Sequence, residues 1–202
     1  MTDYIEHVGI EDSHAMDHIV DMVEEIRTVD GAIETLSALF TKYPDYINAI
    51  ANFAVPYIHS EIEGDSLPVV RWMVEHGWDP STFKNANPDG DTLLEHVVSR
   101  GEPPSHLKHM SLLGWVDYIH ELAKNNPTLL EPAHELNACE TAIVGRGEGC
   151  QNDSKAWFPV VRKLIQLGHP RPRYSMLKEY CEDDFEPKTL DCLYVYCLDF
   201  TD

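Results

Sequence analysis

The sequence is poor in basic residues. It contains 15 lysines and arginines against 35 aspartates and glutamates, which gives a formal net charge of −20 over 202 residues. Proteins that bind nucleic acids gain much of their affinity by neutralising phosphates with cations, so this balance argues against direct binding to DNA or RNA. It argues in the same way against anionic membrane surfaces. A protein partner with a basic surface would instead be attracted.

Long apolar runs and paired cysteines are also missing. No run approaches the ~20 apolar residues that span a bilayer. The first residues, Met1–Glu6, lack the basic and apolar regions of a secretion signal. The five cysteines are an odd number and none forms a Cys-x-x-Cys pair, which favours reduced thiols over a disulfide framework. The sequence therefore predicts a cytoplasmic protein, either in the producing cell or in an infected host cell.

Motifs for catalysis or for a cofactor lack the residues that their chemistry needs. The glycine-rich stretch Gly145–Gly149 has neither the lysine nor the following hydroxyl residue of a phosphate-binding loop. His14 and His18 have the i, i+4 spacing of a zinc clamp, but no distal ligand is evident, and two histidines on an acidic helix surface is the favoured interpretation. The sequence predicts a protein that is not an enzyme and that binds no metal and no cofactor.

What the sequence does contain is an internal repeat. Segments Leu67–Pro80 and Trp157–Pro170 share Pro-Val-Val-Arg, then five mostly apolar residues, then a glycine, which is Gly77 or Gly168. Self-similarity of this kind indicates a repetitive architecture, which is more often a binding surface than a catalytic vessel. Apolar residues recur elsewhere at helical spacing and strand signals are scarce, so we expect an all-α protein.

The stretch Asp89–Gly101 resembles the opening of an ankyrin repeat, whose core reads Gly-x-Thr-Pro-Leu-His-x-Ala. Gly90 and Thr92 match that pattern, and Glu95 replaces the histidine. Asn137–Ile143 is a weaker second copy, in which the threonine after Glu140 takes the place of the ankyrin threonine. That threonine would cap the first helix of the repeat. The two Val-Val-Arg helices look like the second helices of ankyrin repeats.

The resemblance covers about residues 45–170 and implies a short ankyrin-like solenoid of helix-turn-helix repeats with long inter-helix loops. Gly77, Asn125 and Gly168 mark expected helix ends that are 48 and 43 residues apart. Consensus ankyrin repeats are ~33 residues long, and a spacing of ~40–47 also suits HEAT-type helix pairs, which remain the alternative. We expect a single domain over 1–202, with a helical cap at 1–44, repeats at 45–170 and an acidic cap at 171–202.

The negative charge is concentrated at the two ends of the sequence. Residues 1–30 carry a net charge of −8 and residues 179–202 carry −7. One interpretation is that polar caps keep the ends of a solenoid in solution. The other is that an acidic end binds a basic partner, for which the densest acidic spot supplies the candidates Glu182, Asp183, Asp184 and Glu186.

The resemblance also implies where a partner would bind. In ankyrin-like proteins the partner usually contacts the turns before the first helices and the inner helical face. On this chain those positions are Trp78, Asp79, Phe83, Asp89, Asp91, Asn137 and Glu140. Trp78 is the best hot-spot candidate, because tryptophan often dominates interface energetics. The competing interpretation is that Trp78 packs over the end of its own helix.

These observations predict a non-catalytic protein-protein binding module. Its most concrete form is an acidic inhibitor, of the immunity or phage counter-defence type, that occludes a basic and possibly nucleic-acid-handling target protein. A nucleic-acid mimic is one alternative, although the charge lies at both ends of the sequence and not along one stripe. A host-directed ankyrin adaptor or effector is another.

Overall fold

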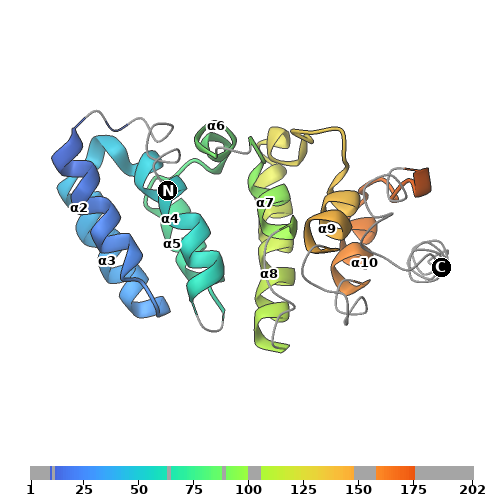
Figure 1. Cartoon of the computed structure of the whole chain (residues 1–202), viewed down its shortest axis with the longest axis horizontal. Helices are drawn as coiled ribbons and strands as arrows, with labels where there is room; N and C mark the ends of the chain where they lie inside the picture. The colour runs from blue at the N-terminus through green and yellow to red at the C-terminus, as the bar shows by residue number, and fades with distance from the viewer. Residues whose placement is uncertain are drawn as a thin grey trace. The chain divides into compact units, whose positions relative to one another are not determined.

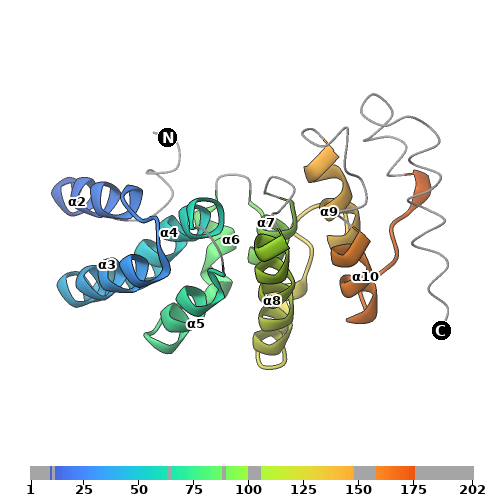
Figure 2. The same cartoon turned by 90° about the horizontal axis from the view of Figure 1, so that it is seen from below.

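A computed structural model describes residues 10, 12–62, 65–87, 90–99, 106–147 and 158–175, and every regular element in these ranges is helical (Figures 1 and 2). The all-α class expected from the sequence is therefore confirmed. The chain divides into two compact units, Met1–Leu93 and Leu94–Asp202. The three-part division expected from the sequence stays a prediction. Among the described helices, none combines the length and the apolar character that crossing a bilayer requires.

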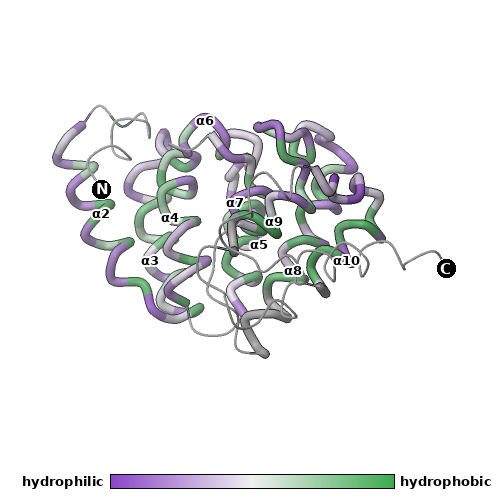
Figure 3. Tube along the Cα trace, turned by 45° about the vertical axis from the view of Figure 1, so that its right-hand side comes forward, coloured by the Kyte–Doolittle hydropathy of each residue, from purple (hydrophilic) through white to green (hydrophobic). Residues whose placement is uncertain are grey.

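The first unit is built around α3, which packs against α2, α4 and α5. Hydrophobic and hydrophilic residues alternate along α2 and α3, as Figure 3 shows, so each helix turns one face to the core. In chain order the elements are α2 (Ser13–Glu24), α3 (Val29–Lys42), the 3-10 turn η1 (Pro44–Tyr46), α4 (Ile47–Glu61), α5 (Leu67–Glu75), the 3-10 turn η2 (Pro80–Thr82) and α6 (Phe83–Ala86).

Side-chain caps fix where the first two helices begin, and they differ from the sequence expectations. The sequence predicts Ser13 as the N-cap of the first helix, but Asp12 caps α2, because its Oδ1 accepts from the backbone N–H of His14 at 3.0 Å. Thr28 caps α3, and its Oγ1 accepts from the N–H of Gly31 at 3.1 Å. Gly31, which the sequence suggested as a break between helices, therefore lies in the first turn of α3.

Helix α4 continues through a proline. The sequence predicts that Pro56 kinks or splits this helix, because proline removes one hydrogen bond of the helix ladder. The structure has one helix from Ile47 to Glu61 with Pro56 inside it, so the proline does not split the helix. Residues 50–55 and Ile58 are buried. Tertiary packing on this scale supplies most of the stability of a helix in a protein, which offsets the lost bond.

In the second unit, α10 packs against α9 and α8. The sequence predicts two helices between 105 and 124, whereas the structure has the single helix α8. The sequence also predicts that a loop begins at Gly145, whereas α9 continues to Gly147. The elements are α7 (Leu93–Ser99, beginning at the unit boundary), α8 (His106–Ala123), the 3-10 turn η3 (Pro127–Leu130), α9 (Ala138–Gly147) and α10 (Phe158–Gln166).

The two repeated helices end with the same backbone geometry. Gly77 follows α5 with φ of 104° and Gly168 follows α10 with φ of 95°. The residue after each glycine donates its N–H five residues back, from Trp78 to Met73 O and from His169 to Leu164 O, both at 3.0 Å. This is the Schellman arrangement, which needs a left-handed residue at the glycine. The sequence repeat therefore corresponds to a structural repeat of helix ends.

Replacing either glycine with alanine is expected to lower the free energy of unfolding by ~1–2 kcal/mol, the cost of a left-handed conformation for an L-residue. An added Cβ would meet no atom within 4 Å at Gly168, and only Ile47 Cδ1 at 3.9 Å at Gly77. The loss thus reports backbone conformation and not a clash. Urea unfolding of G77A and G168A measures it. Asparagine at the same positions should cost less, since it tolerates this conformation, and an alanine variant as stable as the original would contradict the assignment.

Candidate partner-binding site

Trp78 lies in the core of the first unit. Its side chain is 2 % exposed, and its Nε1 donates to Asn52 Oδ1 at 2.9 Å. Asn52 Nδ2 in turn donates to Thr82 Oγ1 at 3.0 Å. Buried polar groups are stabilising only when they are paired in this way. The structure thus gives Trp78 the role of packing over the end of its helix, which corrects its choice as the leading contact for a partner.

The other first-unit candidates differ in exposure. Phe83 begins α6 and is fully buried, so its side chain offers no contact surface either. Asp79 is exposed, and its Oδ1 accepts from Ser81 N at 3.0 Å and Ser81 Oγ at 2.8 Å, which holds the carboxylate over the turn. Asp91 is half-buried. Asp89 and the C-terminal candidates Glu182, Asp183, Asp184 and Glu186 lie outside the described residues.

In the second unit, Asn137 caps α9. Its Oδ1 accepts from the N–H groups of Cys139 at 3.0 Å and Glu140 at 3.1 Å. Glu140 Oε2 accepts from Asn137 N at 2.9 Å, which completes a capping box. The cap expected at Thr141 is therefore wrong by four residues. Thr141 lies inside the helix, where its N–H donates to Asn137 O at 2.8 Å.

Glu140 is a buried anion held by an arginine. Its side chain is completely buried. Its Oε1 accepts from Arg173 N at 2.7 Å and Arg173 Nε at 2.8 Å, and its Oε2 accepts from Arg173 Nη2 at 2.8 Å. Burial alone would raise the pKa of Glu140, but these bonds and the one from Asn137 N outweigh it and hold the pKa below its ordinary value. Glu140 is thus engaged within its own unit.

A second buried glutamate lies at the start of α7. Glu95 is the third residue of α7, as Glu140 is of α9. Glu95 is 2 % exposed, and its Oε1 accepts from Ala133 N at 2.9 Å. Each glutamate therefore binds a backbone N–H in a loop more than 30 residues further along the chain. The patterns Thr92-x-x-Glu and Asn137-x-x-Glu are capping-box signals that sequence reasoning could have used to align the two copies.

Two imidazoles meet where α10 ends. His120 Nδ1 donates to Val116 O at 2.7 Å, so its Nε2 is the acceptor for His169 Nε2–H, also at 2.7 Å. The ring centroids are 4.9 Å apart and the ring planes meet at 83°, an edge-on arrangement. Burial, and then the charge of His120, lower the pKa of His169 to about 4.

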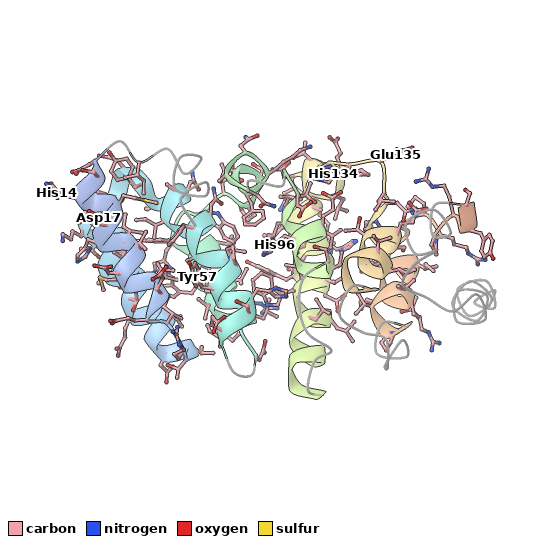
Figure 4. The ribbon with its side chains drawn as sticks, in the orientation of Figure 1. His14, Asp17, Tyr57, His96, His134 and Glu135 are labelled. Carbon is pink, nitrogen blue, oxygen red and sulfur yellow. The ribbon has the colours of Figure 1, made fainter. Side chains whose placement is uncertain are left out.

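Exposed acidic side chains recur along the first two described helices and the turn between them. Helix α2 contains no lysine or arginine. The carboxylates of Asp17, Asp21, Glu25, Asp30 and Glu34 are exposed on α2, on α3 and between them. Figure 4 shows His14 and Asp17 on the outer side of α2. We call these five carboxylates the α2–α3 acidic surface.

The histidines of α2 do not form a metal centre in the part of the chain that the structure describes. His18 Nε2 lies 3.5 Å from Lys42 Nζ, and an ammonium at this distance disfavours a second cation. Within the described ranges, no three histidine, cysteine, aspartate or glutamate side chains are grouped to hold a metal ion.

No protein-family model, no curated protein and no solved structure matches this chain.

Proposed function

We propose that this chain is a non-catalytic module that binds a basic protein, and that it acts as an inhibitor by covering that protein's surface. The observation that carries the proposal is the α2–α3 acidic surface: five exposed carboxylates lie on or beside a helix that has no lysine or arginine, and Arg27 is the one lysine or arginine between Asp17 and Glu34. Clustered charge of one sign attracts partners of the opposite sign and accelerates their encounter. A nucleic-acid-handling target suits this role, since such proteins carry basic surfaces.

We further propose an ankyrin-like solenoid as the architecture. In support, the helices that follow Thr92 and Asn137 each have a buried glutamate as their third residue, Glu95 and Glu140. Matching Schellman turns close α5 and α10. Repeated units with repeated loops provide an extended surface for protein binding. Within this proposal, Asp79 and Asp91 stay contact candidates, because neither carboxylate is buried.

Neutralising the α2–α3 acidic surface is expected to reduce capture of the partner at least ~10-fold, since charge complementarity mainly sets the encounter rate and specificity. The test variant is D17N/D21N/E25Q/E34Q. The matched control, D45N/E61Q/D65N/E75Q, removes the same number of exposed carboxylates from the same unit. Immobilised chain is incubated with lysate of its native host, and the retained protein is quantified by mass spectrometry.

Salt provides the second arm of this experiment. Raising the salt concentration from ~50 to ~500 mM shortens the Debye length and should weaken capture by the unmodified chain. The control variant should capture the partner less than ~2-fold more weakly than the unmodified chain does. The two variants have the same net charge and differ only in where the charges were removed, so a larger loss in the test variant reports the location of the charge. Equal losses in both variants, or capture that does not change with salt, would overturn the proposal.

A further inference from the structure

The residues after α10 lie across the start of α9 like a bound peptide. Asn137 Nδ2 donates to Arg171 O at 3.4 Å, and Pro172 is buried. The N–H of Arg173 donates to Glu140 Oε1 at 2.7 Å. The backbone of residues 171–173 is therefore held on both sides of the proline by side chains of α9 and its cap.

The guanidinium of Arg173 completes the arrangement. Its Nε and Nη2 each donate to one oxygen of Glu140 at 2.8 Å, and Nη2 also donates to Glu135 O at 2.9 Å. The arginine side chain is 48 % exposed whereas the glutamate is completely buried, so the carboxylate forms the floor and the guanidinium lies at the opening. Figure 4 labels His134 and Glu135 in the loop before α9. Such two-point pairing is strong and specific for arginine over lysine.

At the start of α7, Glu95 accepts the N–H of Ala133, so a buried glutamate binds a loop N–H there as well. The contacts at α9 use groups that any arginine-containing peptide possesses: a carbonyl, an N–H and a guanidinium.

We propose that the start of α9 is a binding site for an extended, arginine-containing peptide, and that residues 171–173 occupy it in cis. Asn137, Glu140 and the carbonyl of Glu135 form the site, and an arginine of a basic partner protein takes the place of Arg173. This inference rests on the proposed function, which supplies the basic partner. A ligand tethered in cis acts at an effective concentration of about millimolar. Residues 171–173 therefore exclude peptides that bind weakly, and a partner protein that makes further contacts elsewhere displaces them.

The test removes the cis arginine and supplies one in trans. The full chain carrying Arg173→Ala is titrated with acetyl-Arg-Pro-Arg-Tyr-amide by isothermal calorimetry. We expect saturable binding to this variant, binding to the unmodified chain at least ~10-fold weaker because the site is occupied, and at least ~10-fold loss in the double variant R173A/E140Q. A peptide with citrulline in place of its second arginine keeps the shape without the charge and should not bind. Circular dichroism shows that each variant is folded.

Two results would overturn the inference. One is a folded R173A chain that does not bind the peptide, and the other is equal binding with glutamate and with glutamine at position 140. If R173A does not fold, amide exchange of the unmodified chain decides: excess peptide should accelerate exchange at Arg173 N–H and leave α10 unchanged, and no acceleration refutes displacement. Because these experiments use a synthetic peptide, failure of lysate capture would refute the proposed function without affecting them.

Discussion

Replacing Trp78 with alanine is expected to lower the free energy of unfolding by ~3–5 kcal/mol, the range for truncating a large buried aromatic side chain. The indole is 2 % exposed, so its removal leaves a cavity. It also takes away the donor that satisfies Asn52 Oδ1 at 2.9 Å, and a buried acceptor without its partner adds to the loss. Urea unfolding monitored by circular dichroism measures the change.

A second variant separates packing from hydrogen bonding. Trp78→Phe keeps most of the apolar contact and loses only the Nε1–H donor, so we expect a loss of ~1–3 kcal/mol. Truncating the exposed Lys84 to alanine serves as the control, for which surface substitutions predict a change within ~0.5 kcal/mol. A Trp78→Ala chain that keeps its stability but loses partner binding would place the indole on the surface, against its burial here.

Mild acid is expected to destabilise the second unit. His96 in α7 is 1 % exposed, and burial lowers its pKa to about 4 from 6.5. Because the folded form binds its proton less readily than the unfolded form, the stabilisation is fully present above pH 6.5 and is lost as the pH falls from 6.5 to about 4. At 1.36 kcal/mol per pKa unit, His96 alone accounts for about 3 kcal/mol. His169, with its pKa also lowered to about 4, acts in the same direction but is partly screened by solvent.

Unfolding in urea at pH 7.0, 6.0, 5.0 and 4.5 tests this dependence. The variant His96→Leu cannot be protonated at this position, so it should lose markedly less stability over this range. His14→Gln, at an exposed position on α2, is the matched control and should follow the unmodified chain. An unmodified chain and a His96→Leu chain that lose stability in parallel would show that His96 does not govern the acid response.

The sequence predicted the helical class and the glycine turns correctly because both depend on local chemistry. Gly77 and Gly168 are required by a backbone conformation that few other residues adopt. The caps were harder, since Asp12 and Ser13 are adjacent and both are common N-cap residues. The split expected at Pro56 does not occur, because the local cost of a proline is visible in the sequence whereas the burial of α4 that offsets it is not.

The candidate site depended on tertiary information that no local pattern contains. A tryptophan between glycine and aspartate is compatible with an exposed turn and with a buried one. The buried position of Trp78 depends on Asn52, a distant residue in the sequence that accepts its Nε1–H. Glu140 was selected as a contact for an external partner, whereas Arg173, 33 residues further on, already binds it. The acidic character of α2 could be predicted from the sequence, since the helix itself contains no lysine or arginine.

The buried glutamates of α7 and α9 each accept a hydrogen bond from a backbone N–H. Glu95 holds the N–H of Ala133, and every amino acid except proline offers that same group. Substitution of Ala133 by any residue other than proline is therefore expected to keep this contact with Glu95.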